Sequence, residues 1–175
     1  MGIRTDLEKV SRDIWSDGIL TIRPVETEED IVCAVDGLRL REGQEELVNP
    51  AWFSIGRAYL SREDNLPCLV TERDGTAVGF INIGRWLGSG DACTWSFFID
   101  GDHQGKGYGR RTAKLAVDIL RATGCRQIKL AAETANKAAQ RLYMSLGFRR
   151  LEEMDGEDLV YGLSCGMPEN GKGTV

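Results

Sequence analysis

The stretch that decides the fold of this chain reads Gln104-Gly105-Lys106-Gly107-Tyr108-Gly109. An apolar run from Thr94 to Ile99, which we expect to be a strand, precedes it, and a segment of helical character from Arg110 to Thr123 follows it. Glycines at alternate positions let backbone N–H groups approach a ligand with no Cβ in the way. The helix start directs its dipole and its unpaired N–H groups at the same place. The pattern therefore predicts a loop that binds phosphate.

Charges around this loop favour an anionic ligand. Lys106, Arg110 and Arg111 crowd the start of the expected helix, which is the end of a helix that disfavours cations. The loop lacks the G-x-x-x-x-G-K-[ST] pattern of a Walker-type triphosphate site. It also lacks G-x-G-x-x-G and lies in the second half of the chain, which disfavours a Rossmann dinucleotide site.

A second motif follows the expected helix and one further strand. It reads Asn136-Lys137-Ala138-Ala139-Gln140-Arg141-Leu142-Tyr143-Met144-Ser145-Leu146-Gly147-Phe148. This N-x-x-A-x-x-L-Y-x-x-x-G-F segment, together with Q-x-x-G-x-G after a strand ending in F-F-I-D, resembles the GNAT N-acetyltransferases. The resemblance covers roughly residues 94–163. It implies an α/β (α+β) fold: a mixed, mostly antiparallel central sheet that splays in the middle, with helices on both faces.

The resemblance also implies acetyl-CoA as cosubstrate and assigns residues to it. The glycine loop and Arg110 would hold the pyrophosphate, and the main chain of Phe97, Phe98 and Ile99 would hydrogen-bond the pantetheine arm as an added strand. Asn136, at the start of a helix, would cap that helix, bind the arm, or do both.

Acetyl transfer to an amine needs a neutral amine and a proton for the departing thiolate. Alkyl amines have a pKa near about 10, so the site must help to remove a proton. The resemblance places Tyr143 as the acid beside the CoA sulfur, although the tyrosine also belongs to a helical apolar stripe and could only pack. No metal is expected, because a single histidine and five scattered cysteines without a C-x-x-C pair supply too few spaced ligands.

The base is less clearly indicated. Polyamine-acetylating relatives often carry a carboxylate before the Phe-Phe pair, but Cys93-Thr94-Trp95-Ser96 contains none. Glu72 and Glu133 lie in or at the ends of neighbouring expected strands and are candidate bases acting through water; an ordinary solvated or paired carboxylate is the alternative for each. His103 is expected to be exposed or near the cofactor rather than a base.

The acceptor side is indicated by residues 38–50, which connect the first two expected helices of the family fold. This connection carries three carboxylates, and its pattern resembles bacterial spermine/spermidine acetyltransferases. Carboxylates spaced along a cleft suit a polycation. The expected substrate-binding residues are Glu42, Glu45 and Glu46. A solvated acidic loop is the alternative.

These observations predict an acetyl-CoA-dependent N-acetyltransferase that acts on a primary amine of a small polyamine by direct attack in a ternary complex. An amine-bearing antibiotic or a protein amine is the alternative acceptor, and a non-catalytic acyl-CoA-binding module is the alternative of another class. Family members are often dimers, so a homodimer is an expectation from the resemblance. The net charge of −5 and the pI near 5.0 argue against nucleic-acid binding.

The organisation expected along the 175 residues is a single domain with two flanking segments. Residues 1–17 are an N-terminal extension with a short appended helix, 18–165 the catalytic domain, and 166–175 a flexible tail. A helix is expected to start at Thr27 and its apolar pattern extends to Leu40. No apolar run reaches the length of a membrane span, and the start has no signal-peptide core. The cysteines fit inert free thiols in a reducing compartment, so a cytoplasmic location is expected.

Overall fold

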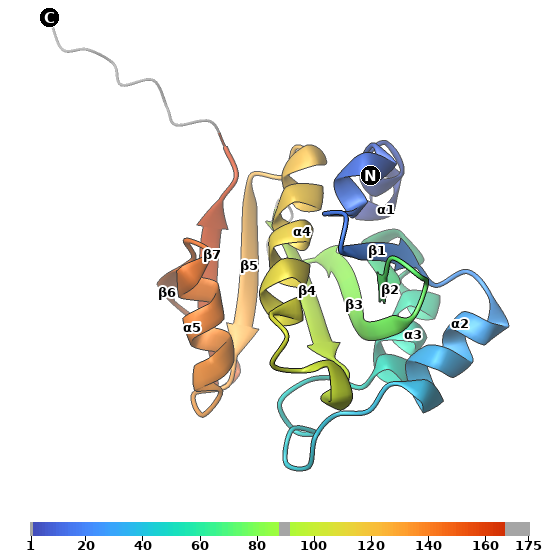
Figure 1. Ribbon diagram of the computed structural model, residues 1–175. Helices are drawn as coiled ribbons and strands as arrows, with labels where there is room; N and C mark the ends of the chain where they lie inside the picture. The colour runs from blue at the N-terminus through green and yellow to red at the C-terminus, as the bar shows by residue number, and fades with distance from the viewer. Residues whose placement is uncertain (1, 88–91, 167–175) are drawn as a thin grey trace, which may run out of the picture.

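A mixed sheet of seven strands crosses the molecule (Figure 1). The computed structural model describes residues 2–87 and 92–166, and the strand order within these ranges is β1-β2-β3-β4-β5-β7-β6. Neighbouring strands are antiparallel except β4 and β5, which run parallel. The strands are β1 (Leu20–Pro24), β2 (Asn65–Glu72), β3 (Ala77–Arg85), β4 (Ala92–Ile99), β5 (Gln127–Ala132), β6 (Arg149–Asp155) and β7 (Asp158–Ser164). The expected fold class is confirmed.

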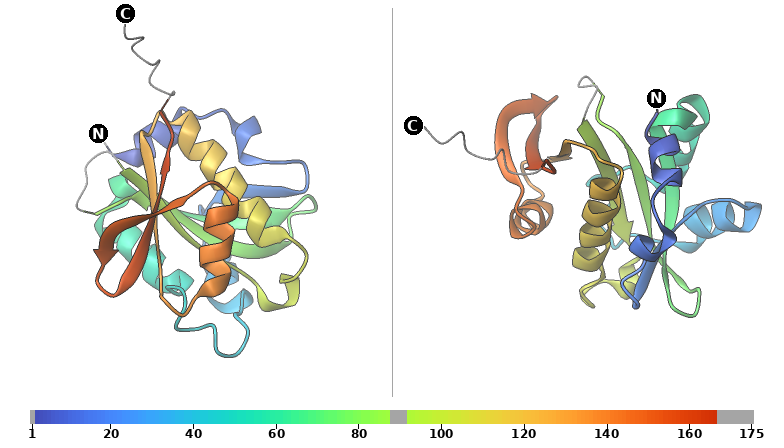
Figure 2. Two further views of the ribbon diagram at one scale, coloured as in Figure 1. Left: turned by 90° about the vertical axis from the view of Figure 1, so that its left-hand side faces the viewer. Right: turned by 90° about the horizontal axis from the view of Figure 1, so that it is seen from above.

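Helices cover both faces of this sheet. The right-hand view of Figure 2, seen from above, shows α4 (yellow) on one side of the strands and α3 (blue-green) on the other. The α-helices are α1 (Ile3–Glu8), α2 (Glu28–Val32), α3 (Ala51–Leu60), α4 (Tyr108–Ala122) and α5 (Lys137–Ser145). None of the helices in the described ranges is both long and apolar enough to cross a membrane.

The helix expected from Thr27 begins there but is shorter than its apolar pattern suggested. Thr27 and Asp30 form a capping box at the start of α2. A π-helical turn then ends at Gly37, and the chain is extended from Leu38 onward. The carboxylate of Asp100 accepts a hydrogen bond from the Arg39 N–H at 2.8 Å, so that donor is no longer available to continue the helix.

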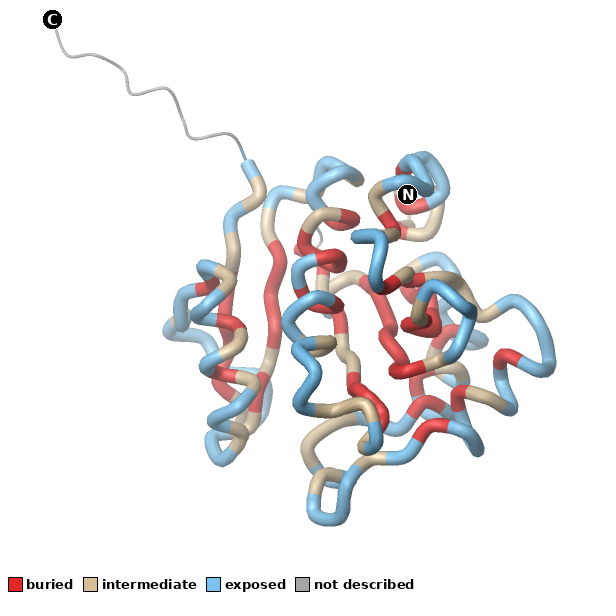
Figure 3. Tube along the Cα trace, viewed as in Figure 1, coloured by how far each residue is buried: buried red, intermediate tan, exposed pale blue. Residues whose placement is uncertain are grey.

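Two apolar cores lie on the two faces of the sheet, and Figure 3 shows that the strands carry many of the buried residues. The larger core packs α1, α4 and α5 against the sheet. The smaller core, on the opposite face, consists of Ala34, Leu38, Ala51, Leu69, Phe80 and Phe98. Burial on both faces fixes the register of the central strands, because a slip of one residue would exchange the two sets of side chains.

The N-terminal segment packs into the larger core. Ile3, Leu7, Val10 and Trp15 are buried there with the sheet residues, although the segment was expected to be an appendage. At the other end of the chain, the tail predicted for residues 166–175 lies outside the described residues after Gly166.

The sheet opens between β4 and β5. These strands pair only at Ala92–Gln127 and Cys93–Ile128, near their N-terminal ends. In contrast, β5 pairs with β7 along its whole length, and β4 pairs with β3 from Cys93 to Ile99. Downstream of Cys93, one edge of β4 therefore has no strand beside it among the described residues. This gap is the splay that the sequence predicted.

Candidate active site

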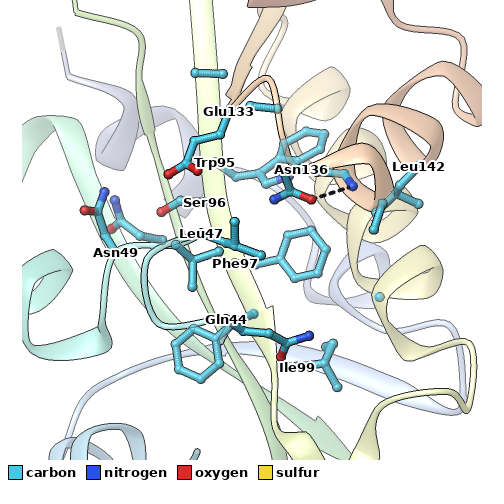
Figure 4. Close-up of a pocket in the computed structure, with 18 of the residues that line it drawn as sticks. Gln44, Leu47, Asn49, Trp95, Ser96, Phe97, Ile99, Glu133, Asn136 and Leu142 are labelled. Carbon is cyan, nitrogen blue, oxygen red and sulfur yellow. Dashed lines mark hydrogen bonds between the residues drawn. The ribbon is translucent and has the colours of Figure 1, made fainter. Parts of the chain in front are cut away.

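A cavity of about 910 Å³ occupies the region where β4 and β5 diverge. Its wall combines the downstream half of β4, the glycine loop, the end of β5 and the start of α5 with residues 44–50 of the connection between α2 and α3. Figure 4 shows side chains from these elements converging on the same space. The cavity volume lies within the range of small-molecule and cofactor sites.

Only alternate residues of β4 turn their main chain toward the gap. The N–H of Asp100 donates to the carbonyl of Val78 on β3, so the alternating antiparallel pattern directs the main chain of Phe98 to β3 as well. Phe97 and Ile99 therefore face the gap, whereas Phe98 does not. This corrects the expectation that all three residues would present main-chain groups to a pantetheine arm. The Ile99 carbonyl is already occupied, because it accepts from Gln104 Nε2 at 2.9 Å.

The glycine loop has the backbone conformation that its sequence requires. Gly105 and Gly107 have φ of 84° and 81°, in the left-handed region that disfavours side chains. Gly107 is the residue immediately before α4, so the first N–H groups of that helix open beside the cavity. Gln104, Tyr108 and Gly109 line the cavity with these glycines. The exposed side chains of Lys106 and Arg110 lie outside its wall.

Two glutamines join the loop to the opposite wall. Gln104 Nε2 donates to Gln44 Oε1 at 2.8 Å, and Gln44 Nε2 donates back to Gln104 Oε1 at 3.3 Å. Gln44 lies in the connection between α2 and α3, 60 residues earlier in the chain. This pair is called the glutamine clasp below.

Asp100 fixes the chain where β4 ends and the loop begins. Its carboxylate accepts from the Arg39 and Asp102 N–H groups and contacts His103 Nδ1 at 2.9 Å. Burial alone would raise the pKa of Asp100, but these hydrogen bonds hold that pKa below its ordinary value. His103 is half-buried and engaged with Asp100, so it lies near the predicted loop as a structural partner.

Helix α5 brings two predicted residues to the cavity. Asn136 Oδ1 accepts from the Ala139 N–H at 3.0 Å, which confirms the predicted cap and leaves the amide NH₂ beside the cavity (Figure 4). Tyr143 is buried between the rings of Phe148 and Tyr161, with centroids 5.9 and 5.8 Å away. Burial raises the pKa of Tyr143 to about 12, so the phenol keeps its proton at neutral pH.

The two candidate bases occupy different places. Glu133, directly after β5, lines the cavity, and Figure 4 shows its carboxylate directed toward Ser96 of β4. Glu72, at the end of β2, lies outside the cavity wall and accepts a hydrogen bond from the Tyr108 hydroxyl. That bond raises the pKa of Tyr108 and anchors its ring in the first turn of α4. The structure therefore does not bring Glu72 together with Tyr143.

The predicted acceptor carboxylates are also divided. Glu45 and Glu46 line the cavity, whereas Glu42 is exposed outside it. The sequence analysis missed Asp155 and Asp158, which reach the cavity wall from the turn between β6 and β7. Burial, together with the charges of Asp155 and Glu157, raises the pKa of Asp158. Asp155-Gly156 signalled a hairpin turn, but nothing in the sequence showed that this turn faces the cavity.

The same cavity contains polar groups that the sequence did not single out. Arg57 of α3 lines it and forms no ion pair with any residue in the described ranges. Arg85 lines the cavity too. Its Nη2 lies 3.6 Å from Asp6 Oδ2, and its Nε lies 3.7 Å from Asp64 Oδ1. Asn82 is buried and donates to Asn65 Oδ1 at 3.0 Å. No group of three or more histidine, cysteine or acidic side chains is arranged to hold a metal ion in the part of the chain that the structure describes.

The splayed sheet, the glycine loop at a helix start and the buried phenol of Tyr143 thus meet around one cavity, which is the arrangement that the family resemblance predicted. Comparison with known proteins agrees: the profile of the acetyltransferase (GNAT) family matches residues 35–148. The chain belongs to this family.

Individual curated proteins match only part of the chain, at low sequence identity. The chain is 34% identical over 85 residues to the L-amino acid N-acyltransferase MnaT of Escherichia coli, a match that covers 47% of this chain and 49% of MnaT. It is 31% identical over 99 residues to the L-methionine sulfoximine/L-methionine sulfone acetyltransferase of Salmonella typhimurium, covering 55% and 58% of the two chains. The chain thus spans about half the length of the curated relatives it matches.

Solved structures support the fold. The ribosomal-protein-S5-alanine acetyltransferase of Vibrio fischeri superposes with a TM-score of 0.64 at 16% identity, covering 83% of this chain and 92% of that one. The yncA structure from Salmonella typhimurium, which contains its cofactor acetyl-CoA, gives a TM-score of 0.56 at 20% identity, covering 89% and 99%.

We predict that Gly107→Val weakens acetyl-CoA binding about tenfold or more, because a side chain at this φ distorts the loop and costs at least one charge-assisted hydrogen bond of about 1.5–3 kcal/mol. The matched control is Gly75→Val, which places the same strain in the β2–β3 turn, at φ of 92°. Calorimetric titration with acetyl-CoA checks both variants. Equal affinity of the Gly107 variant and the parent would contradict the role of the loop.

We predict that Tyr143→Phe lowers kcat about 10²-fold while acetyl-CoA affinity and thermal stability stay close to those of the parent, because only the phenolic proton is lost. Tyr161→Phe is the control, since Tyr161 is a buried neighbour of Tyr143 that lies outside the cavity wall. Single-turnover release of CoA thiol measures the effect. Full activity of Tyr143→Phe would leave the residue with a packing role only.

We predict that Glu133→Gln lowers kcat about tenfold, short of the roughly 10²- to 10⁴-fold expected when a base contacts the amine directly. Glu72→Gln should change kcat much less, because its carboxylate faces Tyr108 outside the cavity. Steady-state rates at saturating acetyl-CoA compare the two variants. A larger loss for Glu72→Gln than for Glu133→Gln would reverse this assignment.

Proposed function

We propose that this protein is an acetyl-CoA-dependent N-acetyltransferase that acetylates a primary amine of a small, cationic molecule. The observation that carries the proposal is the placement of Tyr143 and Glu133 in one cavity with the glycine loop. In this proposal the loop binds the pyrophosphate, and the main chain of Phe97 and the Ile99 N–H hold the pantetheine arm.

The chemistry follows from these positions. Glu133, acting through water, accepts a proton from the acceptor ammonium, and the neutral amine attacks the thioester carbonyl in a ternary complex. As the C–S bond breaks, the Tyr143 phenol gives its proton to the CoA sulfur. The high pKa of Tyr143, which results from burial, keeps that proton available before the reaction. The nitrogen of the adduct loses its second proton as the amide forms, and this proton passes through the water of the cavity to the ionised Tyr143.

The charge of the cavity wall favours a cationic acceptor. It contains five carboxylates, Glu45, Glu46, Glu133, Asp155 and Asp158, against the two guanidinium groups of Arg57 and Arg85. Arg85 is itself near Asp6 and Asp64, which offset its charge. This excess of negative charge supports a polyamine, whose distal ammonium groups would lie along the carboxylates while one amine reacts.

A second candidate acceptor is the amine of an amino acid. Arg57 carries a guanidinium without an ion-pair partner among the described residues and lines the same cavity, so it could receive a substrate carboxylate. Two relatives are named as acyltransferases of amino acids or amino-acid analogues. A cytoplasmic location and a homodimer stay predictions from the cysteine usage and the family resemblance.

An acceptor panel distinguishes these candidates. Release of CoA thiol from acetyl-CoA would be followed with spermidine, lysine, methionine, an aminoglycoside and a lysine-containing peptide. The polycation proposal predicts the highest kcat/KM with spermidine. Preference for an amino acid would support the second candidate. Preference for the aminoglycoside would keep a cationic acceptor but exclude a polyamine, and preference for the peptide would overturn both candidates. Acetyl-CoA binding without thiol release from any acceptor would indicate a non-catalytic module.

We predict that Glu45→Gln and Glu46→Gln each raise the KM for spermidine about two- to fivefold with little change in kcat, because exposed ion pairs contribute about 0.2–1 kcal/mol. The effect should shrink as salt is added. Glu42→Gln is the matched control, since it removes a carboxylate of the same connection outside the cavity. For an amino-acid acceptor, Arg57→Gln should instead raise the KM. If spermidine kinetics respond equally to Glu42→Gln and Glu45→Gln, the polycation assignment fails.

A further inference from the structure

Three of the five cysteines meet at the closed end of the splay, away from the active site. Cys93 lies in β4 where that strand pairs with Ile128 of β5, and Cys125 lies between α4 and β5. Cys165 follows β7, and its N–H donates to the carbonyl of Arg126 at 2.8 Å. Cys125 is 32 positions after Cys93 and 40 positions before Cys165, so it is the sheet that brings the three together. This group is called the thiol cluster below.

Backbone pairing makes Cys125 and Cys165 neighbours, because the Cys165 N–H donates to the carbonyl of Arg126, the residue that follows Cys125. The Cys125 side chain also lies near enough to those of Cys93 and Cys165 for the pKa values of the three thiols to depend on one another. No arrangement of ligands suitable for a metal ion occurs in the described ranges, so the cluster is not explained as a metal site. It lies outside the wall of the large cavity, so the proposed acetyl transfer does not use it.

Access differs among the three thiols. Cys93 is 2% exposed, whereas Cys125 and Cys165 are partly exposed. A separate hollow of about 200 Å³, beneath α1, opens onto Cys93 and Cys125. A small oxidant can therefore reach Cys125 through this hollow, and Cys165 through its own partly exposed surface.

The two exposed thiols have opposite protonation preferences. The hydrogen bond from Cys125, assisted by the nearby Arg121 guanidinium, lowers the pKa of Cys165 to about 7. Hydrogen bonds to Cys165 and Cys93, together with burial, raise the pKa of Cys125. With a pKa of about 7, Cys165 is partly thiolate at neutral pH and is the more nucleophilic of the two, whereas Cys125 stays protonated beside it.

We propose that Cys125 and Cys165 are a peroxide-reactive thiol pair that closes to a reversible intramolecular disulfide. The Cys165 thiolate attacks one oxygen of hydrogen peroxide, an S–O bond forms, the O–O bond breaks, and hydroxide leaves and takes up a proton to become water. The sulfur is oxidised to sulfenic acid. The Cys125 sulfur then attacks it, so that the S–S bond forms, the S–O bond breaks, and the oxygen leaves as a second water with the remaining protons.

The disulfide would have a defined structural effect. It would join the chain that enters β5 to the end of β7, at the end of the sheet opposite to Glu133. The two residues are neighbours across the end of the sheet, and the bond requires their sulfur atoms to approach to about 2.05 Å. Because a disulfide restricts the unfolded chain, the oxidised protein should unfold at a higher temperature than the reduced protein.

The test treats the reduced full-length chain with hydrogen peroxide, blocks the remaining thiols with iodoacetamide, and maps the peptides by mass spectrometry. The expected product is a Cys125–Cys165 linked peptide, two hydrogens lighter than its reduced parts and restored by dithiothreitol. Cys33, a partly exposed cysteine of the π-helical turn after α2, is the internal control and should remain alkylated.

Two variants test the order of steps. In Cys125→Ser, Cys165 should accumulate as sulfenic acid that dimedone traps; in Cys165→Ser, the linked peptide and the trapped species should both be missing. The circular-dichroism spectrum and the thermal transition of each variant show that it has folded. Equal oxidation of Cys33 and Cys165, a Cys93–Cys125 link as the main product, links between molecules only, or stoichiometric Zn²⁺ binding by the reduced protein would each overturn the proposal. Because these readouts need no acetyl transfer, they stand apart from the proposed activity.

Discussion

The separation of β4 from β5 is the constraint on which the rest of the structure depends. Two residue pairs hold these parallel strands together, and beyond them the edge of β4 has no neighbouring strand in the described chain. An unpaired strand edge buried in a protein needs partners for its N–H and C=O groups. The fold meets this need in part with the Gln104 side chain, which occupies the Ile99 carbonyl. The remaining groups, on Phe97 and the Ile99 N–H, are suited to a ligand that lies along the strand.

Elements on both faces of the sheet contribute to this opening. The glycine loop and α5 belong to the side of the larger core, whereas residues 44–50 and α3 come from the opposite side. Two substrates can therefore enter from different faces and meet at the gap. Asp100 maintains the geometry between the faces, since its carboxylate binds the Arg39 N–H in the connection between α2 and α3 and His103 beside the glycine loop.

The sequence predicted those features that depend on local pattern. Alternating apolar residues, the capping residues Thr27 and Asn136, and glycines with positive φ each leave a local signal, and their elements formed where expected. Features that depend on long-range geometry were missed or misplaced. Glu72 and Glu133 looked equivalent as strand-end carboxylates, but only the tertiary fold shows that one faces Tyr108 and the other the cavity. Similarly, the five scattered cysteines gave no sign that three of them would gather at one end of the sheet.

The glutamine clasp has a thermodynamic consequence for the two substrates. In the proposed function, Gln44 belongs to the acceptor wall and Gln104 to the cofactor loop, so a ligand that orders one wall would lower the entropy cost of ordering the other. Linkage of this kind is reciprocal: whatever factor the first ligand adds to the affinity of the second, the second adds to that of the first. In the proposed function, these two side-chain hydrogen bonds would thus make the binding of the two substrates cooperative.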